Sequence, residues 1–160
     1  MIEYKVLSRK DLHNEKLVAY FKQLNYLKWL QKDSKWAPEL TVIVATSDTD
    51  FIGHISLLKQ PITLPIANKE VKYNDHSIYE LFVQTFQVNE LYRKLGIGKK
   101  LQELALLETK QQACYQLRSW SSFDKKVNYQ VKFKLGFCFA PSYIESNGKK
   151  IAGGYFVKRV

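Results

Sequence analysis

The stretch that decides the fold is Tyr92-Arg93-Lys94-Leu95-Gly96-Ile97-Gly98-Lys99-Lys100-Leu101. Two glycines alternate with one apolar residue, basic side chains flank them, and helix-forming sequence follows directly. Glycine lets the backbone approach a ligand closely and adopt dihedrals that other residues resist. A helix that begins here directs several unpaired N–H groups, and the positive end of its dipole, at one spot. The stretch therefore predicts a site for a phosphate or pyrophosphate group.

Spacing separates the three kinds of loop that share this chemistry. A Walker A loop requires G-x-x-x-x-G-K-[ST], but Arg93 takes the place of its first glycine and Lys100 that of its hydroxyl residue. A dinucleotide-binding loop requires a third glycine, where this chain has Leu101. The remaining pattern, [QR]-x-x-G-x-[GA], matches Arg93 to Gly98 without a departure.

This pattern resembles the acyl-CoA-binding loop of the GNAT superfamily of N-acyltransferases. The lead-in from Phe86 to Arg93 is similar to that family's L-x-V-x-P-x-Y-R, with Glu90 in place of the proline. Downstream, residues 134–137 (Lys-Leu-Gly-Phe) resemble the K-x-G-F that closes the family's next motif, and residues 154–158 resemble its final strand. The specific part of the resemblance covers about the second half of the chain.

The resemblance implies an α/β (α+β) fold of the GNAT type, with a central mixed, mostly antiparallel sheet flanked by helices on both faces. Hydrophobic periodicity gives a matching order of elements. Strands are expected at 2–7, 41–46, 51–58, 77–88, 114–120, 136–141 and 151–158. Helices are expected at 10–31 (one helix or two short ones), after the glycine loop, and at 124–134. A break is expected at Pro38, and a loop from Pro61 to Asp75.

Composition indicates one soluble domain spanning residues 1–160. The chain is 46% hydrophobic and 25% charged, and no apolar run is long enough to span a membrane. Cys114 and Cys138 are far apart, which is typical of reduced thiols in a cytoplasmic protein, and Cys138 is expected to be a small core residue. The three histidines lack metal-ligand spacing, so no metal is expected. The closing hairpin and aromatic strands are compatible with a homodimer.

The net charge of +10 favours acidic partners, but excess lysine also serves solubility. The lysines form scattered pairs and no nucleic-acid motif accompanies them, so the sequence does not favour nucleic acid as the partner. A polyanionic co-substrate is consistent with the same charge.

The resemblance also implies a donor, acetyl-CoA, and the residues that hold it. The backbone of Phe86 and Val88 would pair with the pantetheine arm, and Asn128 would hydrogen-bond that arm. The pyrophosphate would be held by the loop residues Arg93, Lys94, Leu95, Gly96, Ile97, Gly98 and Lys99. The alternative is that Gly96 and Gly98 only form the turn that starts a helix.

The acceptor amine must lose a proton before it attacks, and a carboxylate is suited to taking it. Glu80 is the leading candidate base, because it lies on the strand before the loop among apolar and aromatic residues that would raise its pKa. The alternative is an edge carboxylate facing solvent. His54 is a second candidate, although a single strand histidine more often has a structural role.

The thiolate must leave, and here the sequence departs from the family. Many members place a tyrosine four residues before the G-F pair, where this chain has Lys132. Tyr129, one helical turn earlier, could reach the sulfur as the general acid if the helix is shifted. The alternatives are that Tyr129 packs in the core and that water protonates the thiolate.

Two functions follow from these residues. The first is an N-acetyltransferase that moves the acetyl group of acetyl-CoA to a primary amine, on a small molecule or a peptide, by direct attack within a ternary complex. The second is a catalytically weak, basic GNAT-like binding module for acidic partners or nucleic acid.

Overall fold

The computed structural model describes residues 1–30, 39–64 and 67–160. Its main sheet has seven strands in the order β1-β2-β3-β8-β9-β11-β10. Neighbouring strands are antiparallel except for β8 and β9, which are parallel. The strands are β1 (Ile2–Leu7), β2 (Leu40–Ser47), β3 (Asp50–Pro61), β8 (Tyr79–Val88), β9 (Gln116–Ser122), β10 (Cys138–Ser146) and β11 (Lys149–Arg159).

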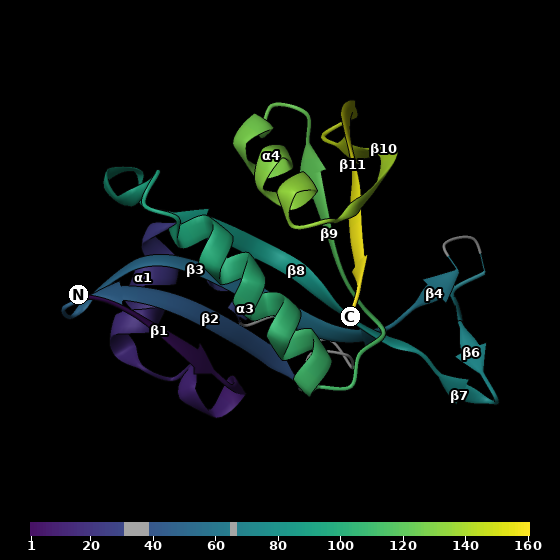
Figure 1. Cartoon of the computed structure of the whole chain (residues 1–160), viewed down its shortest axis with the longest axis horizontal. Helices are drawn as coiled ribbons and strands as arrows, with labels where there is room; N and C mark the ends of the chain where they lie inside the picture. Colours follow the sequence, from purple (N-terminus) through teal and green to yellow (C-terminus); the bar gives the residue numbers. More distant parts are fainter. Residues whose placement is uncertain (31–38, 65–66) are drawn as a thin grey trace.

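Helices cover both faces of this sheet (Figure 1). Alternate residues of β2 show the two layers, because Ile43 packs with the core under α3 (Ile97–Gln111), whereas Val42 packs with Phe21 of α1 (Glu15–Gln23) on the other face. Another helix, α4 (Lys126–Lys134), crosses from β9 to β10 on the α3 side. The predicted mixed, mostly antiparallel sheet with helices on both faces is confirmed.

The N-terminal helical region is divided, as one of the two predicted options had it. A 3-10 helix, η1 (Arg9–Asp11), precedes α1, and the short α2 (Leu27–Leu30) follows it. Asn14 caps α1 by accepting a hydrogen bond from the Leu17 N–H at 3.2 Å. The predicted helix end at Gln31, the break at Pro38 and the second proline of the predicted loop, Pro65, lie outside the described residues.

Two expectations about the fold were wrong. The segment predicted as a loop contains two short antiparallel ladders, β4 (Thr63–Leu64) with β5 (Lys69–Glu70) and β6 (Lys72–Tyr73) with β7 (His76–Ser77). They project beyond the end of the main sheet (Figure 1). The second error is Cys138, which is exposed because its strand lies at the edge of the sheet, whereas Cys114 is buried.

The parallel pair β8–β9 is short and then opens. Pairing runs only from Glu80 opposite Gln116 to Val83 opposite Ser119. Beyond these rungs the two strands diverge into a V, which is visible between β8 and β9 in Figure 1. The helices α3 and α4 follow β8 and β9 in the chain, so both helices begin on the open side of the V.

A β-bulge in β8 lies where the V begins. Ser56 of β3 pairs with Thr85 and Leu57 with Val83, which leaves Gln84 as the extra residue. The bulge reverses the alternation of the strand. Leu81 and Val83 pack with the α3 core before it, whereas Phe86 and Val88 do so after it.

Candidate functional site

The backbone of β8 beyond the bulge faces the V. The Asn89 N–H donates to the Ile52 carbonyl of β3 at 2.8 Å. Because hydrogen bonding alternates along an antiparallel ladder, the N–H and C=O groups of Phe86 and Val88 point away from β3, toward the side on which β9 has diverged. An extended chain laid in the V can therefore pair with the N–H and C=O of Phe86 and the N–H of Val88 as a neighbouring strand would.

The glycine loop lies at the mouth of the V and turns into α3. A short 3-10 helix, η2 (Glu90–Tyr92), leads into it. Lys94 (φ 65°) and Gly96 (φ 80°) both adopt left-handed backbone conformations, and Gly96 is the N-cap of α3. The first N–H groups of α3 have no intrahelical partner, so this end attracts anions. Arg93 is exposed, donates to the Val88 carbonyl at 3.3 Å and pairs with Glu90 at 3.0 Å.

Gly98 faces β8 from the first turn of α3. A Cβ on this residue would lie 3.3 Å from the Phe86 ring and 3.7 Å from the Val88 side chain. The absence of a side chain therefore keeps the helix start close to the strand residues that face the V. Ile97 is buried in the core, and Lys99 is exposed and lies 3.6 Å from Glu103.

Buried polar atoms without a partner among the described residues gather on the elements that form the V. They are Gln84 Oε1 on the bulge of β8, Trp120 Nε1 on the diverging part of β9, Asn128 Oδ1 on α4, and both amide atoms of Gln102 on α3. Unsatisfied buried polar atoms cost free energy and are uncommon in folded proteins. A ligand with amide and carbonyl groups would satisfy such atoms, so these residues fit a pantetheine-bearing substrate.

Asn128 and Tyr129 both bond to the diverging part of β9. The Asn128 Nδ2 donates to the Ser121 Oγ at 2.8 Å, and the Tyr129 hydroxyl donates to the Ser121 carbonyl at 2.9 Å. Tyr129 also packs edge-on against Phe156 at 4.7 Å, and burial raises the pKa of its phenol. The roles predicted for Asn128 and Tyr129 stay predictions; the structure places both side chains at the V.

Lys132 stands where many members of the family have a tyrosine, and the sequence predicted no role for it. It is fully buried, and its ammonium donates to the Ser119 hydroxyl. Its Nζ lies 4.9 Å from the ring centre of Phe156 and 5.8 Å from that of Phe137. Burial lowers the pKa of the Lys132 ammonium to about 7. The spacing of four residues from Asn128 was the available signal, because it places both on one helix face.

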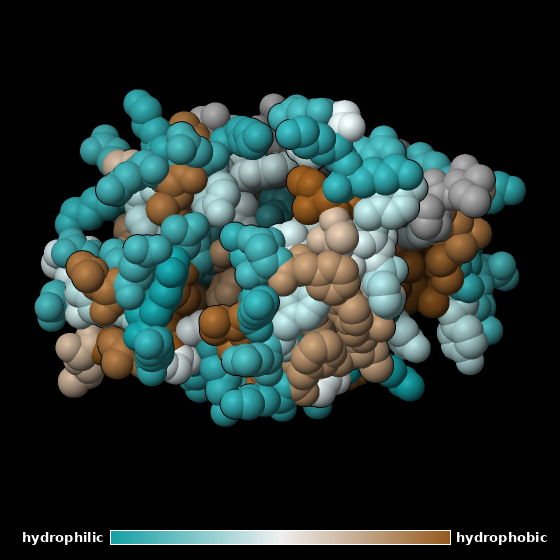
Figure 2. All heavy atoms as spheres, turned by 90° about the horizontal axis from the view of Figure 1, so that it is seen from above, coloured by the Kyte–Doolittle hydropathy of each residue, from teal (hydrophilic) through white to brown (hydrophobic). Residues whose placement is uncertain are grey.

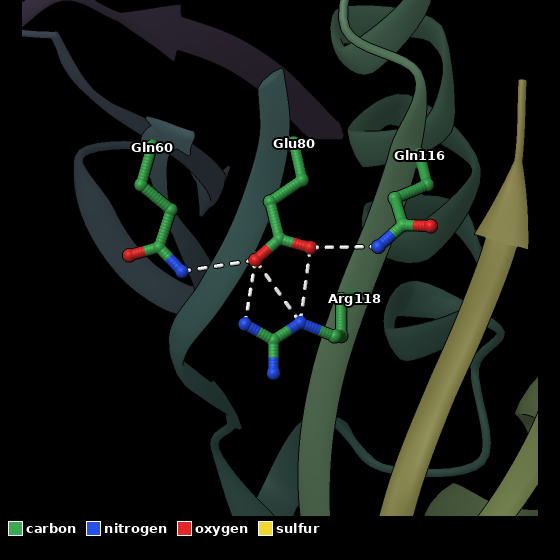
Figure 3. A network of polar contacts seen from close by, with 4 residues as sticks. All are labelled: Gln60, Glu80, Gln116 and Arg118. Carbon is green, nitrogen blue, oxygen red and sulfur yellow. Dashed lines mark hydrogen bonds and ion pairs between the residues drawn. The ribbon is translucent and has the colours of Figure 1, made fainter. Parts of the chain in front are cut away.

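Glu80 lies in polar surroundings, and the expected apolar environment was wrong (Figure 3). Its carboxylate is fully buried and accepts hydrogen bonds from the Arg118 Nη2 at 2.6 Å, the Gln60 Nε2 at 2.9 Å and the Gln116 Nε2 at 2.8 Å. The Arg118 Nε contacts both carboxylate oxygens, at 3.0 and 2.9 Å. The group does not face solvent, which excludes the predicted alternative. Since both oxygens are occupied, the geometry favours a structural role for Glu80 over the predicted role of base.

His54 is neutral and held between α1 and β8. Its Nδ1 lies 3.1 Å from the Tyr20 hydroxyl, and its Nε2 lies 3.0 Å from the Thr85 Oγ1. Burial lowers the pKa of the imidazole to about 3. Both nitrogens have partners, so the structure favours the structural reading of this histidine.

The surface seen from above in Figure 2 is hollowed near its middle, with hydrophobic side chains at the edge of the hollow and mostly hydrophilic ones around it.

In the described part of the chain, no group of three or more His, Cys, Asp and Glu side chains is arranged to hold a metal ion. No helix among the described residues has the length and apolar character needed to cross a membrane.

Comparison with solved structures identifies the fold. NAA60 of Arabidopsis thaliana in complex with acetyl-CoA superposes with a TM-score of 0.73 at 15% identity, covering 100% of this chain and 99% of that one. An acetyltransferase of the GNAT family from Streptococcus pneumoniae gives a TM-score of 0.65 at 13% identity, with 100% of each chain covered. The chain has the GNAT fold.

Other structures with the GNAT fold agree over the whole chain. The NatC complex bound to Gag peptide and CoA gives a TM-score of 0.70 at 18% identity, covering 99% of this chain and 98% of that one. No protein-family model matches the sequence, and no curated protein matches it. The resemblance of the glycine loop to the GNAT acyl-CoA loop is thus joined by a likeness of the entire fold.

Proposed function

We propose that the protein is an N-acetyltransferase that uses acetyl-CoA as donor and a primary amine as acceptor. The observation that carries the proposal is the V between β8 and β9. One edge of the V is backbone that points away from β3, its mouth is the N-terminus of α3, and unpartnered buried polar atoms lie on the elements around it. These features suit an extended pantetheine arm that ends in a pyrophosphate. GNAT-fold structures that hold acetyl-CoA or CoA support the same donor.

In this proposal the residues divide into those that hold the donor and those that shape the reacting end. The backbone of Phe86 and Val88 pairs with the pantetheine arm, Asn128 hydrogen-bonds it, and the loop from Arg93 to Lys99 binds the pyrophosphate. The acetyl thioester supplies the electrophilic carbonyl carbon. The acceptor amine reaches it unprotonated, attacks within a ternary complex, and gives up its proton to water, because Glu80 is held by Arg118.

The acceptor is a small-molecule or peptide amine. Two solved structures of this fold support a peptide amine: the NatC complex is bound to Gag peptide and CoA, and another structure is the ribosomal-protein-S18-alanine N-acetyltransferase of Escherichia coli. A panel of amino acids, polyamines and peptides, with release of the CoA thiol as readout, identifies the class. Both cysteines are free, which supports the predicted cytoplasmic setting.

Acetyl-CoA is expected to stabilise the folded protein, and Gly98→Asp is expected to abolish that effect. A ligand at a hundred times its Kd adds about 2.7 kcal/mol, which corresponds to a rise in Tm of roughly 5–10 °C for a domain of this size. The carboxylate of Gly98→Asp would lie at the anion-binding end of α3 and repel the pyrophosphate. Differential scanning fluorimetry with and without acetyl-CoA measures both effects.

A matched control for this variant is Gln111→Glu. It makes the same change in charge at the exposed C-terminal end of the same helix, so the shift with acetyl-CoA should persist. A wild-type protein that saturating acetyl-CoA does not stabilise would contradict the proposed function. A shift that Gly98→Asp retains in full would contradict the placement of the pyrophosphate at the loop.

A further inference from the structure

Lys132 is a buried amine without a carboxylate partner. Its side chain is 1% exposed, and no ion pair joins it to an acidic residue in the described part of the chain. Burying an uncompensated cation is costly, and the fold meets this one with a hydroxyl group and two aromatic rings only. A leucine or methionine would fill the same space at no such cost, so the amine calls for an explanation other than packing.

The amine lies where the V closes. It donates to the Ser119 hydroxyl, and Ser119 forms the last rung of the β8–β9 pairing, opposite Val83. The next residue of β8 is the bulged Gln84, whose Oε1 is unpartnered, and one turn earlier on α4 lies Asn128 with its unpartnered Oδ1. A chain laid in the V with its pyrophosphate at the mouth therefore carries its opposite, thioester end toward Lys132.

The surroundings of Lys132 are neutral or distant in charge. β9 presents Ser119, β11 presents Phe156, the start of β10 is preceded by Phe137, and α4 itself contributes Tyr129, whose raised phenol pKa keeps it neutral. Lys158 of β11 is directed to the Leu135 carbonyl at the end of α4. The Glu80–Arg118 pair lies on the opposite face of the sheet, because Arg118 alternates with the buried Leu117 and Ser119 on β9.

We propose that the Lys132 ammonium donates the proton to the sulfur of CoA as the thioester is cleaved. This inference rests on the proposed function. The amine nitrogen of the acceptor forms a bond to the acetyl carbon, the C–S bond breaks with its electron pair going to sulfur, and one N–H proton of Lys132 passes to that sulfur. The acceptor nitrogen releases its extra proton to water, and the neutral Lys132 amine regains a proton from solvent.

The burial of Lys132 is a second observation, beside its position, that supports its role as the general acid. A general acid works best when its pKa lies near the working pH. Desolvation brings the Lys132 pKa to about 7, so the amine is available in its protonated form at neutral pH and gives up its proton far more readily than an exposed lysine.

The experiment isolates thiol departure by using hydroxylamine as the acceptor, because this small amine is largely unprotonated at neutral pH. Lys132→Met is expected to lower kcat by about 100-fold or more, while KM for acetyl-CoA changes little.

The wild-type kcat is expected to fall above a pH of about 7, where Lys132 loses its proton, and that falling limb should be absent in Lys132→Met. Lys132→Arg keeps a positive charge that does not deprotonate and should remain slow. Lys134→Met, an exposed change on the same helix, should keep the wild-type profile.

A second readout needs no turnover. With CoA bound, the thiol and Lys132 should titrate as a pair, because the ammonium and the thiolate stabilise each other, so the ultraviolet absorbance of the thiolate should begin to rise at a lower pH in wild type than in Lys132→Met. The inference is overturned if Lys132→Met or Lys132→Arg turns over as fast as wild type, or if the bound thiol titrates alike in wild type and Lys132→Met. It is also overturned if mass spectrometry finds Lys132 itself acetylated in the resting enzyme with acetyl-CoA. If any of these results is found while acetyl-CoA still stabilises the folded protein, the role of Lys132 is rejected and the proposed function stands. If acetyl-CoA does not stabilise the protein, the proposed function itself is rejected.

Discussion

Arg118→Met is expected to lower the free energy of unfolding by about 3–5 kcal/mol, because it leaves the charge of Glu80 buried and unpaired. The Glu80 carboxylate is fully buried, and three of its hydrogen bonds come from Arg118. The guanidinium also lies 4.9 Å from the ring centre of Phe82 and 5.0 Å from that of Tyr155, so the change removes two cation–π contacts. Urea denaturation at pH 7 measures the loss.

Two further variants separate the buried charge from the lost packing. In the double variant Glu80→Gln with Arg118→Met no charge remains, so much of the lost stability should return. Arg159→Met removes an exposed arginine that lies 5.3 Å from the ring centre of Tyr115, and it should cost about 1 kcal/mol or less. A loss below about 1 kcal/mol in Arg118→Met would show that Glu80 does not depend on its partner.

Lys132→Met is expected to make the folded protein more stable than wild type, by on the order of 4 kcal/mol at pH 7 and below. Burial lowers the pKa of this lysine from 10.5 to about 7. Between these values the unfolded chain holds a proton that the folded chain has lost. Wild-type stability therefore rises with pH in this window, by about 1.4 kcal/mol per unit, and the advantage of Lys132→Met should shrink toward pH 10.5.

Denaturation of wild type and Lys132→Met at pH 6, 8 and 10 gives the difference between their free energies of unfolding. The test is whether this difference changes with pH. Lys134→Met serves as the reference, because this lysine is exposed on the same helix and its removal should produce a gap that does not vary with pH. A gap of constant size between wild type and Lys132→Met would contradict the lowered pKa. Together with the predicted loss of turnover, a gain in stability would mark Lys132 as a residue kept for activity.

The sequence predicted the parts of the site that are local in the chain. The start of α3 at the glycine loop and the order of the main-sheet strands and helices follow from residues that are neighbours in sequence. The turn at the tip of β6–β7 has a local signal that the predicted loop from Pro61 to Asp75 did not use, because Asn74 and Asp75 both tolerate the positive φ they adopt.

The missed features depend on strand register. Glu80 reaches Arg118 across the parallel pair β8–β9, in which Phe82 lies directly opposite Arg118. Along the chain α3 stands between the two strands, so no local pattern sets their alignment. Lys132 was treated as a departure from the family rather than as a buried group, because a lysine on a helix is normally exposed. Its burial comes from the packing of α4 on β9 and β11, which only the assembled sheet reveals.

The bulge at Gln84 divides β8 into two halves, and the alternation of side chains between the two faces shifts by one residue from the first half to the second. Its first half carries residues whose alternation is fixed by folding alone, including the Glu80 ion pair, and its second half presents backbone and side chains to the V. A substitution in one half leaves the phase of the other intact. Deleting Gln84 would remove the extra residue and make Val83 and Thr85 neighbours on opposite faces, so both halves would keep their pairing with β3 and the bend at the bulge alone would be lost.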